Sequence, residues 1–120
     1  MRHDDLYLED ALKAIAELRE FLVGITREDF LADRLKQSFL FHRLVIIGEA
    51  CVSVSPIYRS KYPEVPWRQI SGMRNRLVHA YFDLDLTLVW DTASTDLDKL
   101  AAQLKQILDA EFPDSSMFDA

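Results

Sequence analysis

The sequence is poor in cysteine and in positive charge, and it lacks long hydrophobic runs. Its one cysteine, Cys51, excludes an internal disulfide and a zinc site built from several thiolates. Acidic residues outnumber basic ones by 20 to 14, and the net charge of −6 argues against a broadly basic nucleic-acid coat. The longest apolar run, residues 44–47, is far too short to span a membrane, and no apolar segment follows a positive flank at the N-terminus. We therefore expect a cytoplasmic protein with no membrane partner.

Three motifs that mark common enzyme classes are also absent. The chain has no glycine-rich phosphate loop, no Gly-x-Ser-x-Gly elbow and no His-Glu-x-x-His pair. Nucleotide triphosphatases, serine hydrolases and zinc peptidases depend on these motifs, so those activities have no support in the sequence. The three histidines are scattered along the chain and form no cluster with metal-ligand spacing.

Apolar residues make up 49% of the chain, which is enough to build one well-packed domain. Their spacing of three and four residues predicts helices at about 4–24, 33–55, 66–79 and 85–112. The second of these is apolar on nearly every side, so we expect it to lie at the centre. The fold class predicted is all-α, an up-and-down bundle of four main helices plus a short connecting helix.

Local signals set the boundaries of these elements. Thr26 is followed three residues later by an acid, which predicts a short helical turn beginning there. Residues 58–66 are predicted to form one long polar connection, and Asp85 is a candidate cap for the last helix. We expect a single domain at 1–112 and a frayed acidic tail at 113–120.

Four residues within the predicted helices need separate interpretation. His42 lies in the apolar central helix and is interpreted as a hydrogen-bonded structural residue, and Cys51 as a small buried hydrophobe. Glu49 lies on the same helix, where a carboxylate needs a partner. An ion pair between Glu49 and an arginine would be either purely structural or a means of orienting a catalytic arginine. Gly72 weakens the helix around it, which indicates a packing or functional reason.

Basic residues are concentrated in one segment. Residues 58–82 carry five bases and one acid, whereas the parts of the chain before and after them have net charges of −3 and −7. We call these five cations the basic band: Arg59, Lys61, Arg68, Arg74 and Arg76. A local band of this kind binds phosphates even in an acidic protein, and Arg68 and Arg76 are candidate RNA-binding residues.

Arg74, Asn75 and His79 suit phosphodiester cleavage in RNA. The 2′-OH is a built-in nucleophile, so the reaction needs proton transfer and positive charge on the phosphoryl oxygens, but no metal or other cofactor. His79 can act as acid or base near neutral pH, Arg74 can bind phosphate oxygens through two hydrogen bonds, and Asn75 can position one of them. One chain supplies only one histidine in this band, so two proton-transfer roles favour a symmetric dimer.

The helical period separates these side chains. At about 100° per residue, Asn75 and His79 share a face, whereas Arg74 lies roughly 140° from His79. They could converge only in a cleft lined from both sides. Spacing alone also allows a structural interpretation, in which Arg74 and Arg76 form ion pairs with nearby acids and His79 ends its helix favourably.

The run from Arg74 to Tyr81 resembles the Arg-x4-His-x-Tyr pattern of HepT-like toxins, which belong to the HEPN superfamily of all-α ribonuclease domains. The likeness extends to residues 46–50, 66–70, 72–75 and 83–90. It implies a metal-independent endoribonuclease that forms a homodimer, in which the two arginine–histidine motifs meet at the subunit interface. Arg74 and His79 would be catalytic, Asn75 would support them, and the target would be transfer RNA or messenger RNA.

The same resemblance implies a type VII-like toxin–antitoxin system. In this family an MNT-type nucleotidyltransferase antitoxin attaches AMP to the tyrosine of the motif, here Tyr81. A nucleotide phosphate beside the basic band would occupy the space and charge that RNA needs. Without the resemblance, Tyr81 would be interpreted as an aromatic residue packed at a helix end. The alternative function is a non-catalytic helical module that binds a nucleotidyltransferase partner or a nucleotide.

Overall fold

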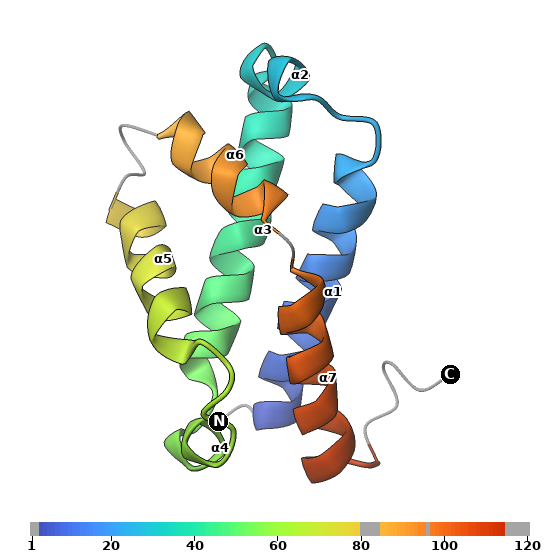
Figure 1. Ribbon diagram of the computed structural model, residues 1–120, viewed down its shortest axis with the longest axis vertical. Coiled ribbons are helices and arrows are strands. Elements are labelled where there is room, and N and C mark those ends of the chain that lie inside the picture. Colours follow the sequence, from blue (N-terminus) through green and yellow to red (C-terminus); the bar gives the residue numbers. More distant parts are fainter. Residues whose placement is uncertain (1–2, 80–84, 96, 115–120) are drawn as a thin grey trace.

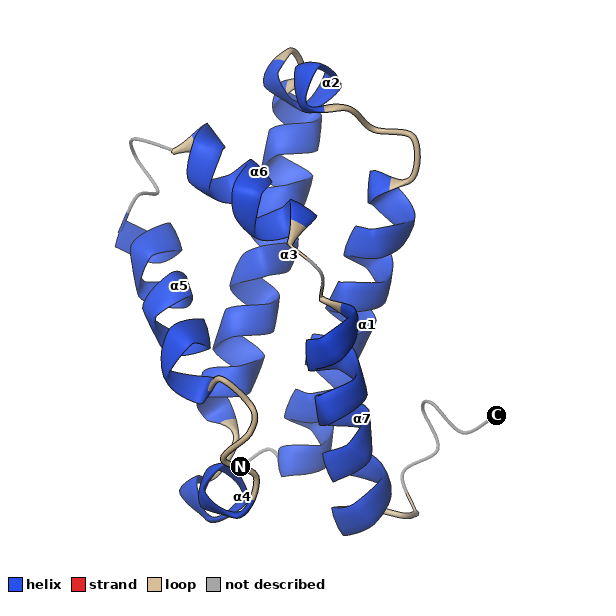
Figure 2. Cartoon of the chain, in the orientation of Figure 1, coloured by secondary structure: helices blue, strands red, loops and turns tan. Residues whose placement is uncertain are grey.

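The structure is a computed structural model and describes residues 3–79, 85–95 and 97–114. In this part of the chain all regular elements are helices, which confirms the all-α prediction (Figure 2). The helices are α1 (Asp4–Leu22), α2 (Arg27–Leu31), α3 (Arg34–Ser53), α4 (Pro56–Lys61), α5 (Trp67–His79), α6 (Leu86–Ser94) and α7 (Asp98–Glu111). None of these helices is both long and apolar enough to cross a membrane.

Helix α3 lies at the centre of the bundle, as its apolar sequence predicts. It packs against α1 on one side and α5 on the other, and α6 crosses it in front (Figure 1). Leu40, Leu44 and Ile47 on α3 are at most 1% exposed, so they form the middle of the core. Helix α3 therefore supplies the central packing surface for α1, α2, α5 and α6.

Helices α1 and α7 close the other side of the bundle, where they lie side by side (Figure 1). The predicted apolar stripe of α1 is buried, with Leu18 fully covered, and α7 contributes Leu104 and Ile107 to the same core. One acidic residue of α1 is also buried: Glu9 is only 7% exposed. Burial raises the pKa of the Glu9 carboxyl, and the neighbouring acids on α1 raise it further.

The capping signals in the sequence are confirmed. The Thr26 hydroxyl accepts a hydrogen bond from the Asp29 backbone N–H at 3.1 Å, and the Asp29 carboxylate accepts one from the Thr26 N–H at 3.0 Å. This reciprocal pair is a capping box. At the start of α6, the Asp85 carboxylate accepts a hydrogen bond from the Leu88 N–H at 3.0 Å.

The predicted polar connection at residues 58–66 is partly wrong, because α4 occupies 56–61. Pro56 stands at the first position of α4. Proline is favourable there because its fixed φ suits a helix and its missing N–H has no intrahelical partner to lose. The Ser55 N–H also donates to the Asp4 carboxylate at 2.8 Å, which ties the start of α4 to the start of α1.

The predicted last helix, 85–112, is two helices. It breaks after Ser94, although apolar residues continue at helical spacing through the break. The hydroxyls of Thr92, Ser94 and Thr95 donate to backbone carbonyls four residues earlier, at 2.6 to 2.8 Å. Such bonds compete with continuation of the helix. Of the predicted tail, residues 115–120 lie outside the described residues.

Truncation of the core at α3 should destabilise the whole bundle. We expect Leu44→Ala to lower the free energy of unfolding by about 2–5 kcal/mol, because it removes a fully buried side chain and leaves a cavity. Leu35→Ala is the matched control on the same helix, since Leu35 is 81% exposed, and should change stability by less than about 0.5 kcal/mol. Urea denaturation of both variants measures this; equal losses would contradict the placement of α3.

Candidate functional site on helix α5

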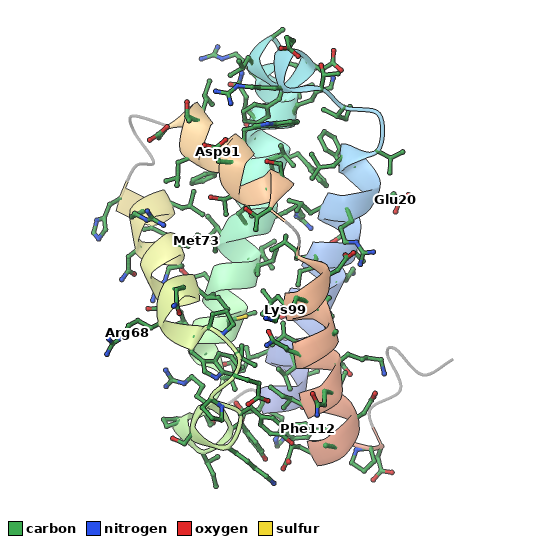
Figure 3. All side chains as sticks on the ribbon, viewed as in Figure 1. Glu20, Arg68, Met73, Asp91, Lys99 and Phe112 are labelled. Carbon is green, nitrogen blue, oxygen red and sulfur yellow. The ribbon has the colours of Figure 1, made fainter. Side chains whose placement is uncertain are left out.

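Helix α5 has one face in the core and one in solvent. Ile70 and Leu77 are buried, and Met73 points toward the middle of the bundle (Figure 3). Arg68 points outward from the other side of the helix (Figure 3), and Asn75 and His79 are exposed as well. The sequence prediction that Asn75 and His79 share a solvent face is therefore confirmed.

Arg74 lies against α3 at its closest contact with α5. A Cβ atom built on Gly48 would be 2.7 Å from Cβ of Arg74 and 3.0 Å from its Cγ, closer than real atoms pack. Residue 48 therefore has to be glycine if the two helices keep this separation. The local sequence around Gly48 does not predict this role, since it depends on Arg74 of α5, some 26 residues further along the chain.

The carboxylate of Glu49 is the partner of Arg74. Nη1 of Arg74 lies 3.7 Å from Oε1 of Glu49, and the two side chains are 27% and 52% exposed. The prediction of an arginine partner is confirmed, although Glu49 lies at the surface of α3 rather than in the interior. An exposed pair at this distance adds little to stability. The pair places the guanidinium beside a carboxylate at the surface of α3.

The guanidinium of Arg74 keeps hydrogen-bonding capacity. Its Nε atom is buried and has no hydrogen-bond partner among the residues that the structure describes. The one ion pair of Arg74 within that part of the chain is the pair with Glu49. A guanidinium carries five N–H donors, so several remain to bind an anion at the edge between α3 and α5.

The basic band is not uniform. Lys61 forms an ion pair with Glu111 at 2.8 Å, and the Tyr62 hydroxyl donates to the same carboxylate at 2.6 Å. The hydrogen bond from Lys61, followed by that from Tyr62, lowers the pKa of Glu111. This cluster ties α4 to α7 and neutralises Lys61. Arg68 and Arg76 are exposed and form no ion pair with any described residue, so they are the free cations of α5.

A pocket of about 480 Å³ lies between α5, α6 and the start of α7. Its apolar floor includes Leu44, Ile47 and Met73, and charged side chains including Arg76 and Lys99 also line it. Arg76 thus belongs both to the solvent face of α5 and to this pocket. The pocket depends on the break between α6 and α7 and on side chains from four helices, so no local sequence signal predicts it.

The structure tests the predictions for Cys51 and His42. Cys51 is buried, and desolvation raises the pKa of its thiol to about 12, which confirms that it is an inert hydrophobe rather than a nucleophile. The structural interpretation of His42 is wrong, because this residue is exposed and hydrogen-bonds to no described residue. His42 lies on the solvent-exposed side of α3.

Two further parts of the predicted site are the modified tyrosine and the absence of a metal. Tyr81 lies outside the described residues, between α5 and α6. Within the described ranges, no group of three or more histidine, cysteine, aspartate or glutamate side chains is placed to hold a metal ion. The site at hand therefore consists of Arg74 with Glu49 on one side of α5, and Asn75 and His79 on the other.

Comparison with known proteins identifies the family. The model of the family described as "Ribonuclease HepT-like" matches residues 11–107. The chain belongs to the HepT-like family. A probable ribonuclease HepT from Thermococcus cleftensis is 38% identical over 105 residues, which cover 88% of this chain and 94% of that protein. A protein of Caldanaerobacter subterraneus subsp. tengcongensis, named as a candidate RNase, is 37% identical over the same shares of both chains.

The match to the HepT-like family covers α3, α5 and residues 80–84, and so includes every residue of the candidate site. No solved structure matches the chain. The family assignment agrees with the resemblance carried by the Arg-x4-His-x-Tyr run, and it supports the HEPN-like bundle. The roles of single residues rest on the geometry of α5.

Adding a side chain at Gly48 should disturb both the bundle and the site. We expect Gly48→Ala to lower the free energy of unfolding by about 1–3 kcal/mol, because its Cβ would force Arg74 and α5 away from α3. Ser38→Ala, on the exposed side of α3, is the control and should stay within about 0.5 kcal/mol of wild type. Thermal unfolding measures the difference. A fully tolerated alanine at residue 48 would contradict the close approach of the helices.

Proposed function

We propose that the chain is a metal-independent endoribonuclease that works as a homodimer. The observation that carries this proposal is the position of Arg74, held against α3 and Glu49 with donors to spare, on the same helix as an exposed His79. Membership of the HepT-like family and the ribonuclease names of its relatives support it. Phosphodiester cleavage through the 2′-OH requires a cation and an imidazole at the same phosphate, and two copies of α5 would supply both.

In the proposed reaction the RNA supplies its own nucleophile. The imidazole of one His79 takes the proton of a 2′-OH, and the 2′-oxygen forms a bond to the adjacent phosphorus. The bond from phosphorus to the 5′-oxygen breaks, and that oxygen takes a proton from a second imidazole. Arg74 stabilises the negative charge that builds on the phosphoryl oxygens, and Asn75 donates a hydrogen bond that positions one of them.

The geometry of α5 supports the proposal of a dimer. Arg74 faces α3 while His79 faces solvent, roughly 140° around the helix by its period, so one chain leaves them on different sides. Each chain also supplies a single histidine to the band. A two-fold dimer that packs the edges of two α5 helices together brings two arginines and two histidines to one cleft.

The acidic charge of the rest of the molecule limits this activity to RNA that enters the cleft. The chain carries a net charge of −6, while Arg68 and Arg76 are exposed without ion-pair partners in the described structure. The acidic surface repels RNA and so weakens nonspecific binding. RNA contact is favoured only where the cations of α5 are concentrated. We propose transfer RNA or messenger RNA in the cytoplasm as the substrate of a toxin of the type VII-like class.

We further propose that an MNT-type nucleotidyltransferase antitoxin neutralises the toxin at Tyr81. The phenol oxygen of Tyr81 would form a bond to the α-phosphorus of ATP, pyrophosphate would leave, and the phenol proton would pass to solvent. Tyr81 follows His79 by two residues, so the attached phosphate would lie near the exposed cations of α5. It would then compete with RNA for both charge and space.

Cleavage in the presence of a chelator tests the catalytic roles. With excess EDTA, wild type should cleave RNA, and Arg74→Ala and His79→Ala should each lose at least about 100-fold in rate, because charge stabilisation or proton transfer is removed. Arg34→Ala, an exposed arginine at the start of α3, is the control and should cleave as wild type does. Circular dichroism verifies that all variants are folded. Folded wild type that binds a nucleotidyltransferase and cleaves no RNA would instead support the non-catalytic module.

Mass spectrometry after incubation with the MNT-type nucleotidyltransferase and ATP tests the modification. Wild type should gain the mass of one or more AMP groups and lose ribonuclease activity. Tyr81→Phe should gain no mass and keep its activity, whereas Tyr7→Phe on α1 should behave as wild type does. An adduct that persists in Tyr81→Phe would rule out this residue as the acceptor.

A further inference from the structure

Gly72 is the one glycine of the chain whose presence the described structure does not require. Gly24 has a φ of 75°, a left-handed conformation that favours glycine, and Gly48 makes room for Arg74. Gly72 has ordinary helical geometry in the middle of α5, and a Cβ built on it would meet no described atom within 4 Å beyond its own chain neighbours and the local backbone of the helix. An interior glycine destabilises a helix relative to alanine. Of the two reasons that the sequence allows, packing or function, close packing within the described chain does not apply.

Gly72 lies in a row of cations. Arg68 precedes it by four residues and Arg76 follows it by four, so the three positions form one ridge along α5, with the two arginines about 12 Å apart along the axis. Asn75 and His79 lie next to this ridge, at three and seven residues from the glycine. All five residues are exposed. The gap left by the missing side chain is therefore bounded by the groups proposed to act on RNA.

The charge of α5 indicates what fills this gap. The helix contains three arginines and no acidic residue, and Arg68 and Arg76 have no ion-pair partner in the described ranges. In the proposed dimer the two copies of this ridge cannot lie directly against each other, because that would bring like charges together. A polyanion would instead be attracted to both arginines at once.

We propose that Gly72 is the point at which the sugar–phosphate backbone of a single RNA strand crosses α5, with Arg68 and Arg76 binding phosphates on either side. This inference rests on the proposed ribonuclease function and identifies the path of its substrate. The absent Cβ lets the strand lie against the helix, so that both arginine side chains reach it from the same ridge. The strand then continues toward Asn75 and His79, one to two turns further along.

A side chain at residue 72 has opposite effects on folding and on RNA binding. Alanine raises helix propensity and fills only solvent, so Gly72→Ala should raise the melting temperature by about 2–4 °C. The same methyl group holds the RNA strand away from the helix. No purely structural role for the glycine predicts a more stable protein that binds its substrate more weakly.

Fluorescence anisotropy with a labelled, single-stranded 2′-O-methyl RNA of mixed sequence measures binding without cleavage, since this probe lacks the nucleophilic 2′-OH. We expect Gly72→Ala to weaken binding about fivefold, equivalent to about 1 kcal/mol, and the larger Gly72→Leu to weaken it further. Loss of both phosphate contacts in Gly72→Leu should reduce the slope of log affinity against log salt by about 1.4. Ser71→Ala, which alters propensity one residue away and off the ridge, should bind as wild type does.

Three outcomes overturn the proposal in distinguishable ways. If wild type cleaves RNA in EDTA and both Gly72 variants bind the probe as tightly as wild type, the path across α5 is wrong and the ribonuclease function stands. If sedimentation shows that Gly72→Leu dissociates the dimer while its affinity for the probe is unchanged, residue 72 contacts a second copy. If wild type neither binds nor cleaves any RNA, the ribonuclease function itself fails.

Discussion

Helix α5 can lie as close to α3 as it does only because residue 48 has no side chain. At that point the Cβ of Arg74 takes the space that a side chain on residue 48 would need. This contact fixes both the separation of the two helices and the rotation of α5. Once Arg74 faces α3 and Glu49, the helical period turns Ile70 into the core and His79 into solvent. The arrangement of the candidate site thus follows from one close approach.

That arrangement divides the chemistry between two sides of one helix. Arg74 is partly buried and restrained by a carboxylate, which suits a group that has to meet developing charge in a fixed position. His79 is exposed, which suits a group that exchanges protons with substrate and solvent. Because neither side is complete, the proposed function needs a second chain, and in that proposal RNA approaches along the cations on the solvent face of α5.

Most of the helices could be predicted from the sequence, because burial of an apolar stripe repeats at the period of the helix. The cap at Asp85 was equally visible, since it depends on residues close in sequence. The break between α6 and α7 was not, because the apolar pattern continues through it while side-chain hydroxyls compete for the backbone carbonyls there. The arginine and histidine of the candidate site can be predicted from the sequence, but the role of Gly48 cannot, because a close approach between two helices leaves no signal in the sequence of either helix alone.

The central claim is that Glu49 directs an arginine held at Gly48 toward the substrate, and Glu49→Gln tests it most directly. Glutamine keeps the shape of the side chain and removes its charge, and the pair is exposed enough that unfolding should change by less than about 0.5 kcal/mol. The measurement is the single-turnover rate of RNA cleavage in EDTA, beside the melting temperature. The account predicts a rate at least about tenfold lower at unchanged stability. Cleavage at the wild-type rate would contradict it.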